Sequence, residues 1–142
     1  MESLETFNRI QGPVQTFGDL IGRCITDIKK TEDELTLYFG EDAYVYMYHQ
    51  QDCCEMVYIE DICGDLDDLI GSPLVEAEEV SNKEIDQPPL DSGDESYTWT
   101  FYKFGTHKGS VVIRWYGSSN GYYSEYVDVK IVDKSNHQKD YV

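Results

Sequence analysis

The sequence predicts an α+β domain that is mainly antiparallel β sheet, with a meander, C-terminal hairpins and one or two short helices. Apolar residues alternate with polar residues or tyrosine in several short runs, which is the period of a half-buried strand. Turns rich in Gly, Asn and Asp separate these runs. With 142 residues and 40% hydrophobic content, the chain can bury one core. We therefore treat residues 1–142 as a single domain.

The first third of the chain predicts the meander. Residues 1–19 contain the Gly12-Pro13 breaker and form an irregular or partly helical lead-in segment. The runs "IGRCITDIKK", "LTLYF" and "AYVYMYH" follow, separated by the turns "TEDE" and "GED". In the last two runs aliphatic residues alternate with Thr or Tyr. We expect three antiparallel strands with one aliphatic face on the core and a tyrosine row on the other.

The middle of the chain predicts two further strands around a short helix. "VYIEDI" and "PLVEAEEV" have strand composition. Between them, "DLDDLIG" predicts one or two helical turns, with Asp65 as the N-cap and Gly71 at the C-terminal end. Residues 81–96 contain tandem prolines, five acids and little to bury, which indicates an acidic loop.

The last third predicts the hairpins. "YTWTFYKF" and "SVVIRWY" are strands joined by the turn "GTHKG". The Asn-Gly pair in "GSSNG" predicts a second hairpin, which pairs "SVVIRWY" with a long strand over "YYSEYVDVKIV". Glu125 interrupts the apolar side of that strand. Residues 133–142 form a polar tail.

Three of the four cysteines lie near His49 in "HQQDCCEMVYIEDICGDLDDLIGSP". Zinc needs about four convergent N or S ligands. His49, Cys53, Cys54 and Cys63 contain no C-x-x-C pair, so we expect no metal site. A bond between Cys53 and Cys54 would require a strained eight-membered ring. We expect Cys53, Cys54 and Cys63 to be free thiols that pack inward as small apolar groups.

Motifs of catalysis and cofactor binding are missing from the sequence. It has no G-x-S-x-G elbow, no phosphate-binding loop and no G-x-G-x-x-G. The register of a calcium-binding EF-hand loop is absent as well. Acidic neighbours would raise the pKa of Cys53 and Cys54 and make them poor nucleophiles. We therefore predict a protein that is not an enzyme, with no catalytic residues and no cofactor.

The net charge of −17 is concentrated in one segment. Fifteen acids and one base lie between Asp52 and Glu95, against 13 acids and 10 bases elsewhere. Such a field repels nucleic acid and anionic membranes and attracts basic protein surfaces, although the acids could also serve only solubility. We predict a partner with a basic surface, no direct nucleic-acid binding and no membrane association. The candidate contact residues are Glu60, Asp61, Asp65, Asp67, Asp68, Glu76, Glu78 and Glu79.

A second candidate site lies near the C-terminal hairpins, where cations and aromatic residues occur together. Arg, Trp, Tyr, Ser and Asn are typical of contact loops, although they also pack across the strands of an ordinary hairpin. Cations beside aromatic rings could bind a nucleotide. The candidate ligand-binding residues are Lys103, His107, Arg114, Trp115, Tyr116, Ser118, Asn120 and Tyr122.

Two segments resemble a family of small phage and prophage proteins that is known as a domain of unknown function. They are "YHQQDCCEMVYIEDICGDLDDLIGSPLVEAEE" and "DESYTWTFYKFGTHKGSVVIRWYGSSNGYYSEYVDV", and the resemblance runs from about Gly22 to Val129. It supplies no catalytic residues. It implies a small viral accessory protein in the cytoplasm of the host cell, and such proteins often counter host defence.

Charge and resemblance together set the functional expectation. We expect a non-enzymatic phage protein that binds and inhibits a host defence factor, with an acidic surface that imitates the phosphates of a nucleic acid. The alternative is a sponge that sequesters a nucleotide immune signal near the C-terminal hairpins. Homo-oligomerisation is left open by the sequence.

Overall fold

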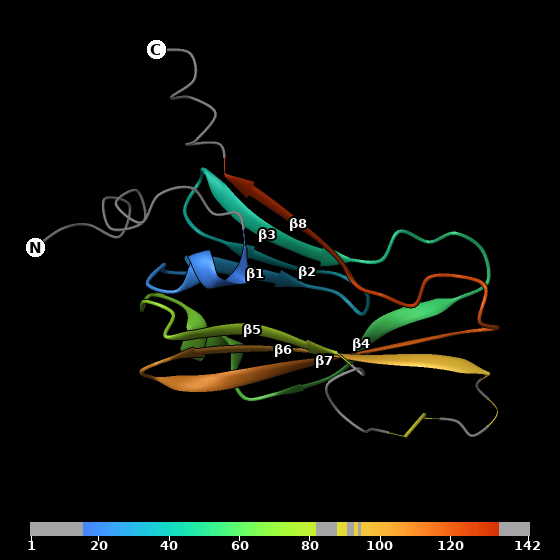
Figure 1. Ribbon diagram of the computed structural model, residues 1–142. Helices are drawn as coiled ribbons and strands as arrows, with labels where there is room; N and C mark the ends of the chain where they lie inside the picture. The colour runs from blue at the N-terminus through green and yellow to red at the C-terminus, as the bar shows by residue number, and fades with distance from the viewer. Residues whose placement is uncertain (1–15, 82–87, 91–92, 94, 134–142) are drawn as a thin grey trace, which may run out of the picture.

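The computed structural model describes residues 16–81, 88–90, 93 and 95–133, which form two antiparallel four-stranded sheets packed face to face (Figure 1). The strand order is β1-β2-β3-β8 in the first sheet and β4-β7-β6-β5 in the second. The chain therefore crosses between the sheets after β3 and again after β7. Most of the predicted lead-in segment, acidic loop and polar tail lies outside the described residues.

The first sheet contains the predicted meander, formed by β1 (Asp27–Lys30), β2 (Leu35–Tyr38) and β3 (Ala43–Tyr48). Burial alternates residue by residue along β2 and β3, with the aliphatic side chains inward and the tyrosines on the outer face. β8 (Asp128–Asp133) pairs antiparallel with β3 and completes the sheet. The period-two pattern thus identified both the strands and the face that each one buries.

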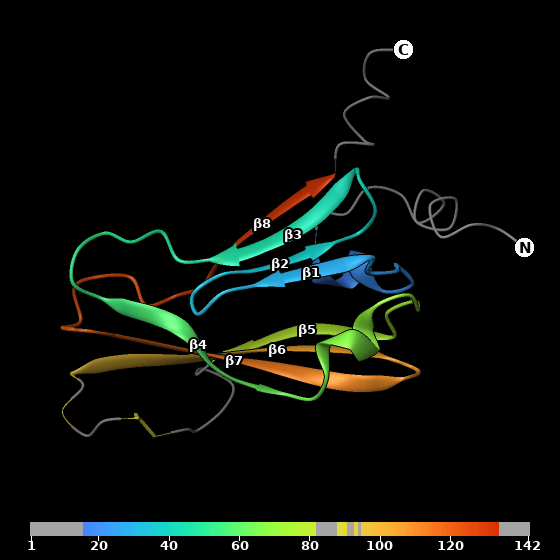
Figure 2. The ribbon, with the colours of Figure 1, turned by 180° about the vertical axis from the view of Figure 1, so that it is seen from behind.

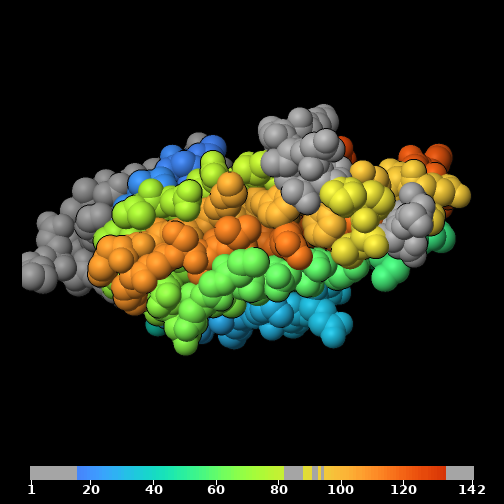
Figure 3. All heavy atoms as spheres, turned by 90° about the horizontal axis from the view of Figure 1, so that it is seen from below, coloured from blue at the N-terminus to red at the C-terminus, as the bar shows by residue number. Residues whose placement is uncertain are grey.

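The second sheet is built around the long hairpin of β6 (Ser96–Thr106) and β7 (Gly109–Ser119), as predicted. β4 (Met56–Cys63) pairs with β7, and β5 (Glu76–Ser81) pairs with β6, so β4 and β5 are the opposite edges of this sheet. Figure 3 shows its outer face, with β6 and β7 in orange between the green β4 and the yellow-green start of β5.

Helical structure in the described residues is limited to two 3-10 turns, η1 (Phe17–Leu20) and η2 (Leu66–Leu69). η2 forms where predicted, and the Asp65 carboxylate accepts a hydrogen bond from the Asp67 N–H at 3.0 Å. The fold is therefore a mainly antiparallel β structure, and the α part of the predicted class is reduced to these short turns. None of the described helices is long and apolar enough to cross a membrane.

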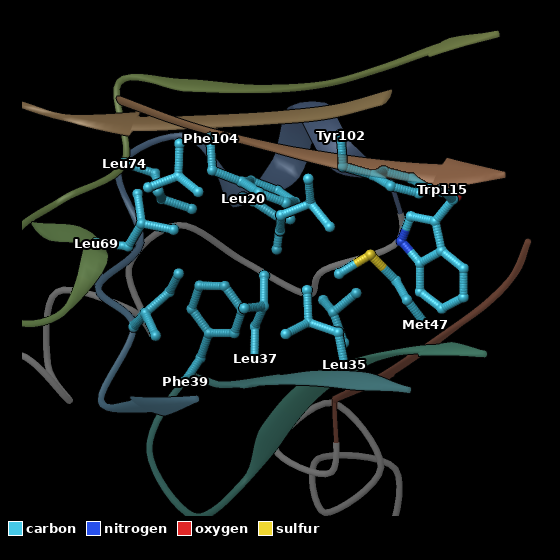
Figure 4. Close-up of a cluster of buried hydrophobic side chains, with 14 of the residues drawn as sticks. Leu20, Leu35, Leu37, Phe39, Met47, Leu69, Leu74, Tyr102, Phe104 and Trp115 are labelled. Carbon is cyan, nitrogen blue, oxygen red and sulfur yellow. The ribbon is translucent and has the colours of Figure 1, made fainter. Parts of the chain in front are cut away.

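The hydrophobic core fills the space between the two sheets (Figure 4). Leu35, Leu37 and Met47 come from the first sheet, and Phe104 and Trp115 come from the second, all fully enclosed. Each fully buried large side chain contributes about 1.5–3 kcal/mol relative to an exposed one. Because Trp115 points into this core, its ring cannot take part in a ligand site on the outer face of β7.

The predicted pairing of the last strand is wrong. Strand structure begins only at Asp128, and β8 pairs with β3 in the first sheet instead of with β7. The chain crosses β7 so closely that a Cβ on Gly117 would lie 2.2 Å from the Glu125 carbonyl oxygen. Gly121, at φ +92°, marks the turn that the Asn-Gly pair predicted, but the turn begins a crossover and not a hairpin.

The predicted environment of the cysteines is also wrong. Cys53 and Cys54 form a disulfide bond with each other, and both residues are exposed in the loop between β3 and β4. Cys63 is exposed at the end of β4, whereas Cys24 is the buried thiol. The prediction failed because it assumed that the "DCCE" segment turns toward the core, while this crossover loop lies outside the sandwich.

Candidate functional site

The carboxylates of η2 and β5, most of them exposed, lie along one edge of the second sheet, which we call the acidic edge. η2 packs against β6 and β7 near their connecting turn, and β5 begins beside it because Glu76 pairs with Gly105 (Figure 2). The structure thereby brings six of the eight predicted contact residues together. These residues are Asp65, Asp67, Asp68, Glu76, Glu78 and Glu79.

Most carboxylates of the acidic edge form no salt bridge with any of the residues that the structure describes. All of these residues except Asp68 are exposed. Within the described part of the chain, the only salt bridge to this edge joins Glu78 to Lys103 at 3.8 Å. Glu76 and Glu78 lie on the same side of β5, about 7 Å apart from the rise of a strand. The edge therefore presents a short row of negative charge to the solvent.

Glu60 and Asp61 do not belong to this row, although they were predicted with it. They lie at an irregularity of β4, on the opposite edge of the second sheet. Arg114 donates from Nε to Glu60 at 2.7 Å, and its Nη2 lies 3.8 Å from the Asp61 carboxylate. The hydrogen bond to Glu60 raises the pKa of Arg114. Arg114 therefore compensates the charge of Glu60 and part of the charge of Asp61 within the protein.

Arg114 is also committed to an aromatic neighbour. Its guanidinium lies 5.5 Å from the centre of the Trp99 ring on the outer face of the second sheet. A nucleotide phosphate would require this cation. Because the guanidinium is already held by its carboxylate partners and the ring, it is not available to a phosphate. Trp115, the next residue, points to the other face of the sheet and into the core.

The other predicted nucleotide-binding residues do not converge. His107 lies at one end of β7 and Asn120 at the other, about 33 Å apart for an eleven-residue strand. Tyr116 is 2% exposed, and its hydroxyl accepts a hydrogen bond from the Leu90 N–H at 3.1 Å. Lys103 pairs with Glu78, Ser118 is half-buried, and Tyr122 is 83% exposed.

A polar cluster that the sequence did not indicate joins the two crossovers. His49 Nε2 lies 2.7 Å from Glu55 Oε2, and His49 Nδ1 lies 2.8 Å from the Tyr126 carbonyl oxygen. The Glu55 carboxylate also accepts hydrogen bonds at 2.9 Å from the N–H groups of Asp52 and Cys53. The hydrogen bond to His49, with help from these backbone donors, lowers the pKa of Glu55 to about 2. This cluster orders the "QDCC" loop against the second crossover.

Glu125 is the second enclosed carboxylate at this end of the molecule. It is 6% exposed and accepts hydrogen bonds from Thr98 Oγ1 at 3.0 Å and from Ser119 Oγ at 2.5 Å. In the sequence it only interrupted an apolar pattern. An acid at an expected core position was the one signal that could have singled it out.

The thiols and acids of the described residues form no metal site. No group of three or more His, Cys, Asp and Glu side chains in this part of the chain could hold an ion. Burial raises the pKa of the Cys24 thiol, which disfavours a reactive thiolate there. The exposed Cys63 thiol lies 3.6 Å from the Asp61 carboxylate.

Comparison with known proteins identifies one family. The family model described as a domain of unknown function, DUF7448, matches residues 18–129. No curated protein and no solved structure matches the chain. The matched range agrees closely with the resemblance found in the sequence, and it includes both crossovers and the acidic edge.

Proposed function

We propose that this chain, which belongs to the DUF7448 family of domains of unknown function, is a non-enzymatic phage accessory protein that binds and inhibits a host defence factor. The phage origin and the target class come from the resemblance described above. The binding role rests on the surface chemistry of the folded domain. In this proposal the partner carries a basic surface, and the acidic edge occupies it in place of a nucleic-acid backbone.

The observation that carries the proposal is the uncompensated charge of the acidic edge. Buried or paired carboxylates serve the fold, as Glu55 and Glu60 do. Exposed carboxylates with no cation beside them cost folding free energy through mutual repulsion. Among the described residues Glu76 is of this second kind, whereas Glu79, although exposed, lies opposite Tyr102, whose hydroxyl has its pKa raised by burial and by Glu79. A basic partner would relieve that repulsion, which supports a docking role for this edge.

The nucleotide-sponge alternative gains no comparable support. Its central cation, Arg114, is held by Glu60 and Asp61. A nucleotide would have to displace both carboxylates and overcome the long-range repulsion of the chain.

The test is an affinity capture from bacterial lysate with matched charge variants. The bait is the full chain, and the test variant changes Glu76, Glu78 and Glu79 to Gln. The control changes Glu32, Asp33 and Glu41, exposed in the turns of the first sheet, to their amides. Both variants lose the same charge, so a difference between them reports the position of the charge and not its amount.

The proposal expects a basic protein that is retained by wild type and control, lost from the test variant and released by salt. Salt acts because exposed charges are screened beyond about 8 Å at physiological ionic strength. The activity of the captured protein is then measured with and without the chain, and we expect inhibition. Equal capture by both variants, or an unaffected activity of the captured protein, would contradict the proposal.

A further inference from the structure

A pocket of about 390 Å³ lies where β6 begins and the second crossover passes over it. Its polar lining includes Ser96, Thr98, Ser124 and Glu125. Tyr97, Tyr123 and Tyr126 complete its walls. We call it the Glu125 pocket. Its volume is within the range of pockets that hold small ligands, and its lining combines hydroxyls, aromatic rings and one carboxylate.

No counter-charge from the described part of the chain reaches the carboxylate in this pocket. Glu125 receives two hydrogen bonds, both from neutral hydroxyls. Within the described residues no Lys, Arg or His lies within salt-bridge distance of it. An enclosed carboxylate is costly unless it is paired with a positive charge. Its oxygens can accept further hydrogen bonds beyond the two observed.

The position of Glu125 is fixed by the backbone, and the side chain is therefore preorganised. The crossover passes over Gly117, where no side chain fits. Ser119 Oγ donates to Glu125 and accepts from the Gly121 N–H at 2.9 Å, which ties the carboxylate to the turn. The carbonyl of Tyr126 is held by His49. A ligand would meet a carboxylate that does not need to be ordered on binding.

We propose that the Glu125 pocket binds the cationic side chain of an arginine or lysine presented by the partner protein. A guanidinium group fits best because it is weakly hydrated, stacks on aromatic rings and forms directed hydrogen bonds to carboxylates. The chain's net charge of −17 favours cations at long range as well. Neutral polar ligands would satisfy the hydroxyls of the pocket and leave the charge unpaired.

This inference rests on the proposed function, because the cation is assigned to the same basic partner. On β6, Tyr102 pairs with Glu79 of the acidic edge. Thr98, which lines the Glu125 pocket, lies four residues before Tyr102 on the same strand. Four residues of a strand span about 13 Å. The acidic edge would then attract the partner, and the Glu125 pocket would anchor one of its side chains.

The test uses small probes and needs no knowledge of the partner. N-acetyl-arginine amide, N-acetyl-lysine amide and the neutral N-acetyl-glutamine amide are titrated into the isotope-labelled full chain, followed by amide resonances. We expect saturable shifts at Thr98, Gly121 and Ser124 with the arginine probe, smaller ones with the lysine probe and none with the glutamine probe. Equal shifts with the neutral probe, or no saturable shift with any probe, would overturn the inference.

Two variants and a control identify the carboxylate as the anchor. Glu125→Gln keeps the shape of the side chain and should weaken arginine-probe binding about tenfold or more, because hydrogen bonds between charged groups are the strong ones. Ser124→Lys places a cation at the pocket and should abolish binding even if Glu125→Gln folds poorly. The control Glu95→Gln removes an exposed charge beside the pocket and should change affinity less than about twofold, as expected for a screened charge.

The two proposals can fail separately. If the probes bind but the acidic-edge variants capture the same proteins as wild type, the pocket stands and the proposed function fails. If the probes do not bind while capture depends on the acidic edge, the pocket assignment fails alone. Unchanged probe affinity in both Glu125→Gln and Ser124→Lys would also exclude this pocket as the binding site.

Discussion

At the end of the sandwich where β6 turns into β7, carboxylates such as Asp67 and Glu76 face the solvent, whereas at the opposite end Glu55 and Glu125 are almost completely enclosed. The first end carries η2 and the start of β5, and the second end carries the two crossovers between the sheets (Figure 1). The same residue type thus repels its neighbours at one end and organises the backbone at the other. Removing charge should therefore affect binding at the first end and folding at the second.

The difference follows from what surrounds each carboxylate. Glu55 receives an imidazole and two backbone N–H groups, so its negative charge is stabilised by fixed donors. Glu76 and Glu79 are exposed, and no salt bridge within the described residues holds either of them. The total charge of the chain consequently says little about any single acid. Burial and partners decide whether a carboxylate stabilises the fold or is available to another molecule.

The largest effect is expected for Gly117→Ala at the crossover end. The added Cβ would meet the Glu125 backbone at 2.2 Å, and neither backbone can move without separating β7 from the crossover. We expect a loss of about 3 kcal/mol or more in the free energy of unfolding, as for severe overpacking. Urea denaturation measures it. Gly18→Ala, whose nearest neighbour would lie at 3.7 Å, is the control, and equal stability of the two variants would refute the close crossing.

Glu55→Gln should give the next largest effect, and it should depend on pH. The folded-state pKa of Glu55 is held at about 2, below the ordinary value of 4.5. Its contribution to stability is therefore fully present above about pH 4.5 and is lost as the pH falls toward 2. We expect the variant to be less stable at neutral pH and to lose less stability on acidification through this window. Thermal unfolding across the window, with Glu41→Gln as control, measures the difference, and parallel curves for wild type and Glu55→Gln would count against it.

Arg114→Ala removes the cationic partner of Glu60, which lies on the edge of the second sheet opposite the acidic edge. The variant loses a partly exposed ion pair with Glu60 and the contact with Trp99, together about 1 kcal/mol of stability. Lys130→Ala, on the exposed part of β8, should cost less. Because Arg114 is committed to these partners, calorimetry of the wild type with a panel of cyclic and adenine nucleotides should show no binding. Nucleotide binding that Arg114→Ala abolishes would instead support the sponge.

The smallest effect on stability is expected at the acidic edge. Changing Glu76, Glu78 and Glu79 to Gln should alter the free energy of unfolding by no more than about 0.5 kcal/mol, because the side chains are exposed and, within the described residues, only Glu78 forms a salt bridge. Chemical denaturation measures this. A loss comparable to that of Gly117→Ala would show that the edge serves folding, and the contrast between the two ends would disappear.

The local sequence pattern was sufficient to predict most of the strands. The alternation in β2 and β3, the turn between β6 and β7 and the Asp65 cap of η2 all depend on residues close together in the chain. Strand period, turn chemistry and helix capping are properties of such short segments, and so they could be predicted. The acidic character of η2 and β5 was predictable for the same reason.

Long-range contacts decided the remainder. Local sequence could not show that the chain after β7 would return to β3, because that pairing joins Val129 to Met47 and depends on how the core closes. It also could not show that His49 would meet the Tyr126 carbonyl, or that Thr98 and Ser119 would enclose Glu125. Alternation identifies which residues of one strand share a face. Only the packing of two sheets decides which carboxylates are enclosed and which are exposed to the solvent.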